Sequence, residues 1–134
     1  MHPYLFMSGN CAEAMARYHE VLGGELEVMK MSDLPAGTPW PPGAEAHHVM
    51  HSALNLPSGR LMAADDSTGD DGPKVGIAVA VAGPNPERAK EIFEALAEGG
   101  EVTMPFAATF WSKGFGACTD RFGVPWMVDT AEDA

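Results

Sequence analysis

Histidine can act as an acid, a base or a metal ligand. Three of the five histidines of this sequence lie close together, at His47, His48 and His51. On an extended strand His47 and His51 would share one face, about 13 Å apart, while His48 would oppose them. That separation is too long for one metal ion, so a metal site would need Asp33 or Asp65 as well. His51 could instead act alone as a general base or as a hydrogen-bond donor to a ligand, and a structural histidine is the other interpretation.

Two aspartates occupy matching places in a sequence that repeats its own pattern. Aligning the last strand of the first half with that of the second makes Asp65 equivalent to Asp129. Strand alternation would point them the same way as Ala63 and Met127, toward a concave surface or its rim. A symmetric pair of carboxylates suits acid–base chemistry. The simpler interpretation is that each aspartate caps a turn or ends a strand in solvent.

Aromatic side chains are concentrated in one stretch of the second half. Four of them are candidates for lining a cleft: Phe106, Phe110, Trp111 and Phe115. Aromatic rings around a concave surface bind flat or apolar molecules. The alternative is a place in the core or in a dimer interface. Nine methionines add soft apolar surface that adapts to its contacts.

The elements that would position these side chains occur twice. In the first half, the alternation of side chains predicts strands over residues 2–8, 25–31, 47–56 and 59–65. Apolar residues at helical spacing predict a helix that begins after Asn10, which would form a capping box with Glu13. The pair Gly23-Gly24 would end that helix, because glycine adopts the left-handed conformation without strain.

The second half follows the same order. Strands are predicted over residues 74–81, 101–106, 114–120 and 124–130, and a helix between the cap at Asn85 and the stop at Gly99-Gly100. We therefore predict an α+β fold of two βαβββ modules, residues 1–65 and 74–134, joined by a polar linker over residues 66–73. Each helix would cover one face of its own sheet and leave the other face to line a cleft.

One segment of the first module has no counterpart in the second. Residues 33–46 contain four prolines and two glycines, which exclude a helix or a central strand there. Because this loop is the large asymmetry between the modules, we expect it to carry function. Trp40, held between Pro39 and Pro41, would pack over the mouth of a cleft or on a partner subunit. Local packing on its own module is the alternative.

Composition and charge limit the classes of function. A chain of 134 residues is expected to form one domain, residues 1–134. Its net charge of −11 leaves no basic surface for nucleic acid or for an anionic membrane, so neither is an expected partner. The sequence shows no apolar run of membrane-spanning length and no secretion signal, which makes the cytoplasm the expected location. Cys11 and Cys118 lack the spacing of metal ligands.

Short stretches throughout the sequence resemble one known family in order and spacing. They are Pro3-Tyr4-Leu5-Phe6, Gly9-Asn10-Cys11, Val21-Leu22-Gly23-Gly24, Val49-Met50-His51, Arg60-Leu61-Met62, Thr109-Phe110-Trp111 and Phe122-Gly123-Val124-Pro125-Trp126. Together they resemble the PhnB-like branch of the vicinal-oxygen-chelate superfamily, which includes glyoxalase I, bleomycin-resistance proteins, fosfomycin-resistance enzymes and extradiol dioxygenases. His51 lies inside one of these stretches, which favours it as the functional histidine.

The resemblance implies paired βαβββ modules whose sheets form cup-shaped half-barrels, with the helices on the outer faces, in a homodimer. Members that need a metal place one ligand at the start of a module's first strand and a carboxylate on its last strand, shortly after a turn glycine. Those positions fall on His2 and Gly76, and on Ala63 and Met127. One histidine cannot hold a catalytic divalent ion, which needs about three protein ligands. We therefore expect no metal and no other cofactor.

The expected function is the binding of a small organic molecule in an apolar cleft, without a catalytic metal, as in the bleomycin-resistance proteins. The candidate cleft residues come from both modules: Tyr4, Phe6, His51, Ala63, Asp65, Phe106, Phe110, Trp111, Phe115 and Met127. The alternative is a glyoxalase-type lyase or isomerase that uses His2 and His51 with a metal or an acid not evident in the sequence. The sequence leaves open whether the protein is an enzyme.

Overall fold

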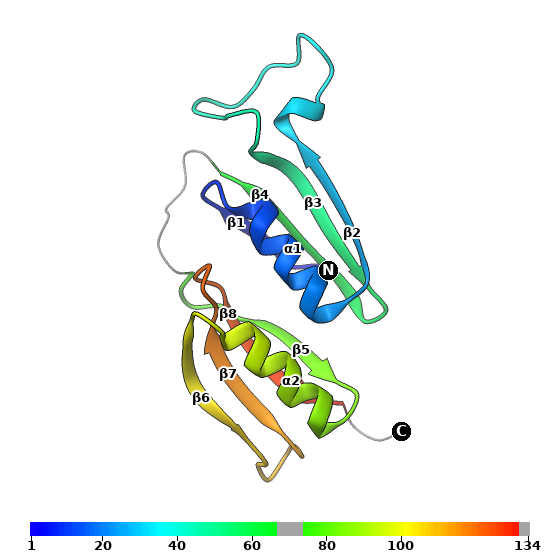
Figure 1. Ribbon diagram of the computed structural model, residues 1–134, viewed down its shortest axis with the longest axis vertical. Coiled ribbons are helices and arrows are strands. Elements are labelled where there is room, and N and C mark those ends of the chain that lie inside the picture. The colour runs from blue at the N-terminus through cyan, green and yellow to red at the C-terminus, as the bar shows by residue number, and fades with distance from the viewer. Residues whose placement is uncertain (67–73, 132–134) are drawn as a thin grey trace. The chain divides into compact units, whose positions relative to one another are not determined.

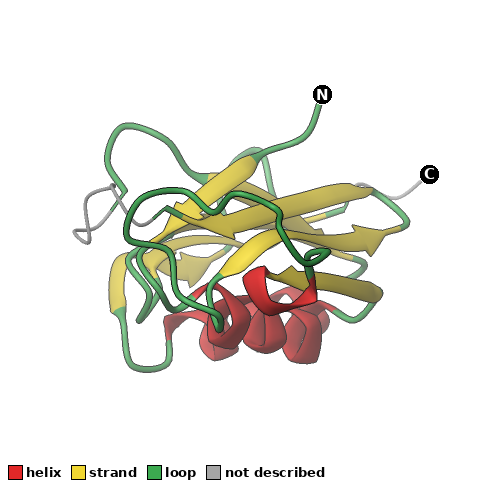
Figure 2. Cartoon of the chain, turned by 90° about the horizontal axis from the view of Figure 1, so that it is seen from above, coloured by secondary structure: helices red, strands yellow, loops and turns green. Residues whose placement is uncertain are grey.

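The computed structural model describes residues 1–66 and 74–131 and separates into two compact units, Met1–Asp71 and Gly72–Ala134. The boundary falls in the predicted linker, of which only Asp66 belongs to the described residues. Most of the regular structure in each unit is strand, and one α-helix accompanies each sheet (Figure 1, Figure 2). Among the described residues, no helix is long and apolar enough to cross a membrane.

Both units have the same order of strands and α-helix, and the first has an additional 3₁₀ helix. The first contains β1 (Tyr4–Met7), α1 (Cys11–Leu22), β2 (Glu25–Lys30), the 3₁₀ helix η1 (Met31–Asp33), β3 (Val49–Leu56) and β4 (Gly59–Asp65). The second contains β5 (Val79–Gly83), α2 (Pro86–Ala97), β6 (Glu101–Ala107), β7 (Phe115–Thr119) and β8 (Pro125–Thr130). The sheet orders are β1-β4-β3-β2 and β5-β8-β7-β6, and the first and last strands of each unit pair in parallel. The predicted α+β fold of two βαβββ modules is confirmed, with an open sheet in each.

The first strand of each unit is shorter than the sequence predicted. β1 begins at Tyr4 rather than at residue 2, and β5 spans Val79–Gly83 rather than residues 74–81. Gly76 has a φ of 82°, in the left-handed region, which interrupts the extended backbone ahead of β5. His2 and Gly76 therefore lie before their strands rather than within them.

α1 packs on one face of the first sheet and forms the core of that unit (Figure 1). Its buried residues recur at helical spacing: Cys11, Ala14, Met15, Tyr18 and Val21. Buried sheet residues alternate along the strands beneath the helix, among them Leu5, Leu54 and Leu61. The sheet face that α1 does not cover is the one on which a binding site can form.

α2 covers the second sheet in the same way, through Ala89, Ile92, Phe93 and Leu96. Trp126 and Val128 of β8 are buried under it. Two glycines permit the close approach. A Cβ on Gly83 would lie 2.5 Å from the backbone nitrogen of Ala89, and one on Gly116 would lie 2.9 Å from the ring of Phe93.

The two helices begin differently, although an asparagine precedes each. Asn85 has extended backbone, and its side chain accepts a hydrogen bond from the backbone nitrogen of Arg88 at 2.8 Å. Asn10 has φ −111° and ψ 17°, which is not the extended geometry of a capping residue. Its Oδ1 is buried without a hydrogen-bond partner among the described residues. The predicted capping box of Asn10 and Glu13 is therefore wrong.

Candidate functional site

The face of the first sheet that α1 leaves uncovered carries a row of aromatic and apolar side chains. Tyr4 and Phe6 of β1 pair with Met62 and Ala64 of β4, so these four residues share one face. The rings of Tyr4 and Phe6 are 5.3 Å apart at a tilted angle. We call the surface formed by these four residues and His51 the open face.

A β-bulge in β3 brings a further side chain to the open face. Val49 and His51 pair with consecutive residues of β2, so Met50 is an extra residue between them. At such a bulge, the regular alternation of side chains is interrupted and a side chain is re-aimed. Met50 accordingly lines the same cavity as Tyr4.

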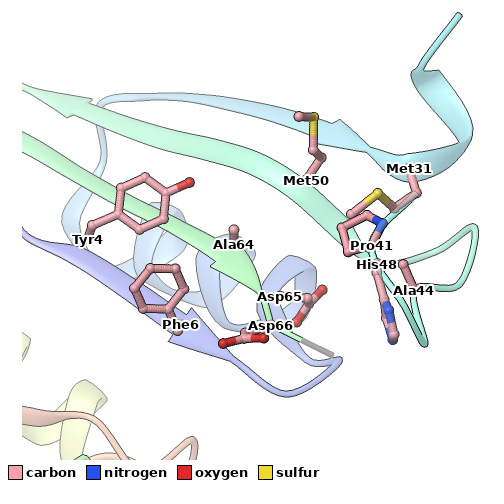
Figure 3. A pocket seen from close by; sticks show the side chains of 10 residues that line it. All are labelled: Tyr4, Phe6, Met31, Pro41, Ala44, His48, Met50, Ala64, Asp65 and Asp66. Atoms are coloured by element: carbon pink, nitrogen blue, oxygen red, sulfur yellow. The ribbon is translucent and has the colours of Figure 1, made fainter. Parts of the chain in front are cut away.

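A cavity of about 410 Å³ lies against the open face, within the first unit (Figure 3). Its lining joins the strands to the loop that precedes β3: Tyr4, Phe6, Met31, Pro41, Ala44, His48, Met50, Ala64, Asp65 and Asp66. Sites for small organic molecules typically enclose roughly 300–1,000 Å³ and combine an apolar lining with a few polar groups. Both the size and the composition of this cavity fit that description.

The proline-rich loop forms one wall of the cavity, through Pro41 and Ala44. The base of this loop is held by two backbone hydrogen bonds, Ser32 N to the Ala46 carbonyl at 3.1 Å and Met31 N to the His48 carbonyl at 2.8 Å. Trp40 is 43% exposed and is not among the described residues that line the cavity. Its packing over a cleft mouth or on a partner stays a prediction.

Asp65 connects three elements at the edge of the cavity. Its Oδ1 accepts hydrogen bonds from the backbone nitrogens of Gly9 at 2.7 Å and Cys11 at 3.0 Å. Its Oδ2 accepts one from the backbone nitrogen of Val49 at 2.8 Å. A carboxylate is favoured at a helix N-terminus by the helix dipole. Asp65 therefore stabilises the start of α1 in place of Asn10, and it also fixes β3 against β4.

The aligned aspartates Asp65 and Asp129 do not face the same way. Asn55 pairs with Arg60 in the first unit, whereas Thr119 pairs with Pro125 in the second, so the second turn is one residue longer. Because strand side chains alternate, one extra residue reverses every face that follows it. Asp129 lies on the sheet face opposite α2, where its carboxylate accepts from the Ser112 hydroxyl.

The same difference in turn length explains why the predicted sheet face of Ala63 is wrong. This residue, a predicted cleft residue, is 0% exposed and pairs in register with Leu5 and Ser52, which are also buried. All three lie on the face that α1 covers. Met127, its aligned counterpart, is 40% exposed and alternates with the buried Trp126. Ala63 is therefore a core residue rather than part of a cleft.

His51 is not among the described residues that line the cavity, but it contacts Tyr4, which does line it. The Tyr4 hydroxyl and His51 Nδ1 are 3.2 Å apart, and the histidine tautomer decides which group donates. Burial raises the pKa of Tyr4 above its ordinary value, and the nearby Cys11 adds to the shift. Tyr4 is therefore a neutral hydroxyl that can donate or accept a hydrogen bond at the cavity wall. A tyrosine–histidine pair can also transfer a proton.

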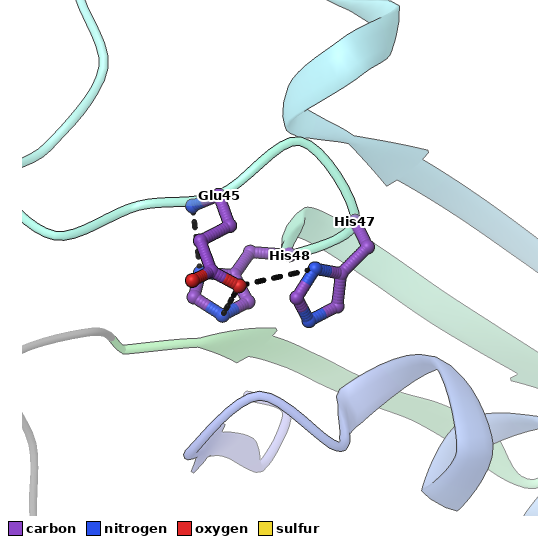
Figure 4. Close-up of side chains that lie close together, drawn as sticks. All are labelled: Glu45, His47 and His48. Atoms are coloured by element: carbon purple, nitrogen blue, oxygen red, sulfur yellow. Dashed lines mark hydrogen bonds and ion pairs between the residues drawn. The ribbon is translucent and has the colours of Figure 1, made fainter.

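His47 and His48 lie in the loop before β3, not on the strand, and meet Glu45 there (Figure 4). Glu45 Oε2 is 3.4 Å from His47 Nδ1 and 4.0 Å from His48 Nε2, and one donor atom of each residue lies within 4.8 Å of the others. His48 Nδ1 accepts a hydrogen bond from the Glu45 backbone nitrogen at 3.0 Å. The neutral ring then carries its proton on Nε2, which leaves that atom no lone pair for a metal.

The ligand positions implied by metal-dependent relatives do not fit a divalent ion in this chain. His2 is exposed ahead of β1, Gly76 has no side chain, and Ala63 is buried under α1. Met127 offers a thioether, which is a poor ligand for a hard cation. Both oxygens of Asp65 already accept backbone N–H groups. These residues do not supply the roughly three ligands that a catalytic ion needs.

The predicted aromatic cluster of the second unit divides in the structure. Phe106 lies against Phe93 of α2, with ring centres 5.7 Å apart, so it belongs to the helix side. Phe110, Trp111 and Phe115 form a chain of edge contacts at 4.8 and 5.6 Å. Phe110 is 97% exposed and Trp111 53%, whereas Phe115 is buried. Phe106 is therefore packed on the core of its unit instead of joining the other three aromatics.

The cavity brings together Tyr4, Phe6 and Asp65 from the predicted cleft residues. Its other lining residues were not among those candidates. Ala64 could have been found by pairing β1 with β4, because it lies opposite Phe6. Met50 depends on a bulge, and Pro41 depends on the path of a long loop. The sequence contains no periodic signal for either feature.

The fold and this site define a member of a known class. The chain belongs to the Glyoxalase/Bleomycin resistance protein/Dioxygenase superfamily, whose family model matches residues 1–128. It is similar to the solved structure of protein PA1353 from Pseudomonas aeruginosa, with 40% identity, a TM-score of 0.85, and 99% of this chain and 98% of that chain covered.

Two further relatives place it in the PhnB-like branch. The PhnB protein from Bacillus cereus is 25% identical with a TM-score of 0.76, over 98% of each chain. Protein YjdN from Escherichia coli (strain K12) is 31% identical over 144 residues, which covers 98% of this chain and 95% of YjdN. The resemblance to the PhnB-like branch is therefore confirmed.

Proposed function

We propose that this protein binds a small organic molecule in the cavity of its first unit and does so without a catalytic metal. The observation that carries the proposal is the cavity itself, about 410 Å³ in volume, between the open face and the proline-rich loop. Tyr4, Phe6, Met31 and Met50 supply apolar and aromatic contact. The Tyr4 hydroxyl, Asp65 and Asp66 supply the few polar contacts that orient a ligand.

A metal is not part of the proposal because Asp65, His48 and His51, the donors nearest the cavity, are already hydrogen-bonded. Asp65 accepts three backbone N–H groups, and His48 uses Nδ1 to accept a fourth. His51 is hydrogen-bonded to Tyr4 rather than to a second candidate ligand. A divalent ion would have to break several of these bonds to collect its ligands.

A glyoxalase-type lyase or isomerase is the second candidate, and the Tyr4–His51 hydrogen bond is the observation that favours it. That pair could move a proton to or from a bound molecule. The structure gives His2, the other proposed catalytic histidine, an exposed position ahead of β1. Since the hydrogen-bond partner of His51 is Tyr4 and not His2, binding has more support than catalysis.

We also propose a homodimer in the cytoplasm. Large apolar side chains are exposed in both units, among them Phe6 and Met29 in the first and Phe110 and Trp111 in the second. Exposed apolar surface of this kind marks interaction sites. Both cysteines are free and buried, which suits a reducing compartment. Light scattering at micromolar concentration tests the dimer, and a monomer would refute it.

The binding proposal can be tested with 1-naphthylmethanol, a neutral aromatic probe of suitable size. With ¹³C-labelled methionine methyl groups, we expect the probe to shift the signals of Met31 and Met50. The Ala64→Phe variant fills the cavity from β4 and should weaken binding by about tenfold or more, since the probe loses most of its buried apolar area. Ala16→Phe on the exposed side of α1 is the matched control and should bind normally. Unchanged Met31 and Met50 signals at saturating probe would overturn the proposal.

A further inference from the structure

We propose that His51 determines which hydrogen-bonding groups the cavity selects, because it sets the direction of the Tyr4 hydroxyl. When His51 is protonated, the cavity favours a ligand that presents a hydrogen-bond acceptor, such as the carbonyl oxygen of a ketone. This inference rests on the proposed binding function and adds a chemical preference for the ligand and the residue that sets it. It follows from one hydrogen bond at the cavity wall and from the protons that its two groups carry.

The hydroxyl of Tyr4 lies between His51 and the cavity. Tyr4 lines the cavity, and its hydroxyl points toward the side that carries Met50 (Figure 3). Its oxygen is 3.2 Å from His51 Nδ1, and the centres of the two rings are 6.0 Å apart. Among the described residues, Tyr4 is the hydrogen-bond partner of the His51 ring, which leaves Nε2 able to take or release a proton.

The number of protons on this pair decides what it can offer a ligand. A tyrosine hydroxyl has one hydrogen to donate, and a neutral imidazole has one donor and one acceptor nitrogen. If Nδ1 of His51 accepts, the Tyr4 hydrogen points to His51 and the Tyr4 oxygen offers a lone pair to the cavity. If Nδ1 donates, the Tyr4 oxygen accepts that bond and its hydrogen is available to the cavity. A neutral His51 therefore allows both arrangements.

Protonation of His51 removes this choice. Both nitrogens of an imidazolium are donors, so Nδ1 can only donate to the Tyr4 oxygen. Tyr4 keeps its own proton, because burial raises its pKa and the nearby Cys11 adds to the shift. The Tyr4 hydrogen must then turn away from His51 and toward the cavity. Histidine changes its charge between about pH 5 and pH 8, so the preference for an acceptor should increase as the pH falls through that range.

Charged groups on the neighbouring strands also face His51. Glu25 and Glu27 of β2 lie on its sheet face, since they alternate with Met29, which pairs with His51. Arg60 of β4 lies on the same face and is 3.7 Å from the Glu27 carboxylate. Among the described residues, none of these charged groups is hydrogen-bonded to the His51 ring. Tyr4 is therefore the group whose hydrogen bonding responds to a proton on His51.

The cavity wall contributes three further charged or titratable groups: His48, Asp65 and Asp66. Asp65 is occupied by backbone N–H groups, and His48 Nδ1 accepts the backbone N–H of Glu45. Because His48 is a second histidine beside the ligand, an experiment that varies the pH must separate its effect from that of His51.

Two neutral bicyclic probes of similar size distinguish the two directions of the Tyr4 hydroxyl. 1-Indanone accepts hydrogen bonds and has no N–H or O–H donor, whereas indole donates one N–H and has no comparable acceptor. Neither probe changes its charge between pH 5.5 and pH 8. Calorimetry at both pH values gives the ratio of their association constants. We expect the indanone-to-indole ratio to rise by roughly two- to tenfold from pH 8 to pH 5.5, the range of one hydrogen bond.

The ring nitrogens of His51 give a second readout that does not depend on affinity. In protein with ¹⁵N-labelled histidine at pH 8, bound 1-indanone should favour the tautomer of His51 with a proton on Nδ1. Bound indole should favour the tautomer with Nδ1 unprotonated. A residue with only a structural role would keep one tautomer with both probes, and that result would contradict the inference.

Four variants identify the group responsible. His51→Gln and Tyr4→Phe should each give a ratio that no longer changes with pH, because one lacks the titrating ring and the other lacks the hydroxyl. His47→Gln, in the exposed loop before β3, is the matched control and should keep the wild-type change. His48→Gln tests the second histidine. Loss of the pH dependence in His48→Gln, with its retention in His51→Gln, would assign the effect to His48 and overturn the inference.

The outcomes separate this inference from the proposed function. If both probes bind and their ratio is the same at pH 8 and pH 5.5, His51 does not set the preference, while the binding function stands. If neither probe binds, this inference fails, and the result with 1-naphthylmethanol decides independently whether the binding function also fails.

Discussion

The two units share one topology but differ in the loops that precede their third strands. In the first unit a long loop joins η1 to β3 and contributes Pro41 and Ala44 to a cavity. In the second, a shorter loop joins β6 to β7 and carries the exposed pair Phe110 and Trp111. That loop is fixed by hydrogen bonds from the backbone nitrogens of Trp111 and Ser112 to Thr109 Oγ1.

This difference shows how a repeated scaffold can be specialised without changing its sheets. Each sheet still packs its helix on one face with the same strand order. The changes are confined to a loop, a turn and the residue that caps the helix. In the first unit an aspartate from β4 serves the helix start, and in the second the local Asn85 does so. The first helix therefore depends on the strand beside the cavity.

The largest expected effect on stability comes from replacing Asp65. The Asp65→Ala variant leaves three backbone N–H groups without their acceptor and should cost about 2–4 kcal/mol of unfolding free energy. Asp129→Ala should cost about 1 kcal/mol, because Asp129 accepts from one hydroxyl and from the neighbouring Thr130 nitrogen. Urea denaturation measures both values.

Amide hydrogen exchange shows where the Asp65→Ala loss acts. Exchange should accelerate at Gly9, Cys11 and Val49, the three donors to this carboxylate. Asp65→Asn keeps one oxygen acceptor and should fall between wild type and Asp65→Ala. Equal losses of stability in Asp65→Ala and Asp129→Ala would contradict the different roles of the two aspartates.

A smaller effect is expected in the pH dependence of stability, to which each unit contributes one buried thiol. Burial raises the pKa of Cys11 to about 12 and that of Cys118 to about 11, from a value of 9.0. The folded state therefore disfavours the thiolates. The stability due to these thiols is complete below pH 9 and declines as the pH rises toward the folded values.

Unfolding free energies between pH 8.5 and about 11 test this contrast. The decline with pH should be less steep in both Cys11→Ala and Cys118→Ala than in wild type, and Cys11→Ala should show the larger change near the top of the range. The wild-type curve serves as the control for tyrosine and lysine titration. Rapid modification of either thiol by a disulfide reagent in the native protein at pH 8 would contradict their burial.

The fold was readable from the sequence because its signals are local. Glycines at Gly23 and Gly99 mark the helix ends, and alternation marks most strands. The sheet faces of the side chains on β4 and β8 could not be predicted correctly, because the alignment matched Gly59 with Gly123, and these glycines occupy different positions in their turns. Gly59 begins β4 and pairs with Leu56, whereas Gly123 lies in the turn before β8. One residue of turn length then reversed the assignment of Ala63.

The candidate site was readable only where it follows regular strands. Tyr4 and Phe6 alternate along β1, so their shared face could be predicted. Met50 reaches the cavity through a bulge, and Pro41 through a loop whose path depends on tertiary hydrogen bonds. His48 was weighed as a metal ligand, yet its hydrogen bond to Glu45 depends on a turn that spacing alone does not specify.

The smallest expected effect on stability, together with a clear effect on binding, comes from deleting part of the loop that distinguishes the units. Deleting residues 36–43 removes Pro41 but leaves Met31, Ser32 and the residues that bond them in place. We expect the unfolding free energy to change by about 1 kcal/mol or less, since long surface loops add little to stability. The affinity for 1-naphthylmethanol should fall by roughly tenfold, because one apolar wall of the cavity is lost.

The Trp40→Ala variant separates the loop's lining residues from its exposed tryptophan. If Trp40 packs over the cavity mouth, Trp40→Ala should weaken probe binding. If it packs on a partner subunit, the same variant should weaken the dimer and leave probe affinity nearer to wild type. Calorimetry and light scattering on the same samples distinguish these results. A loop-deleted protein that keeps both the wild-type dimer and the wild-type probe affinity would show that residues 36–43 contribute to neither assembly nor binding.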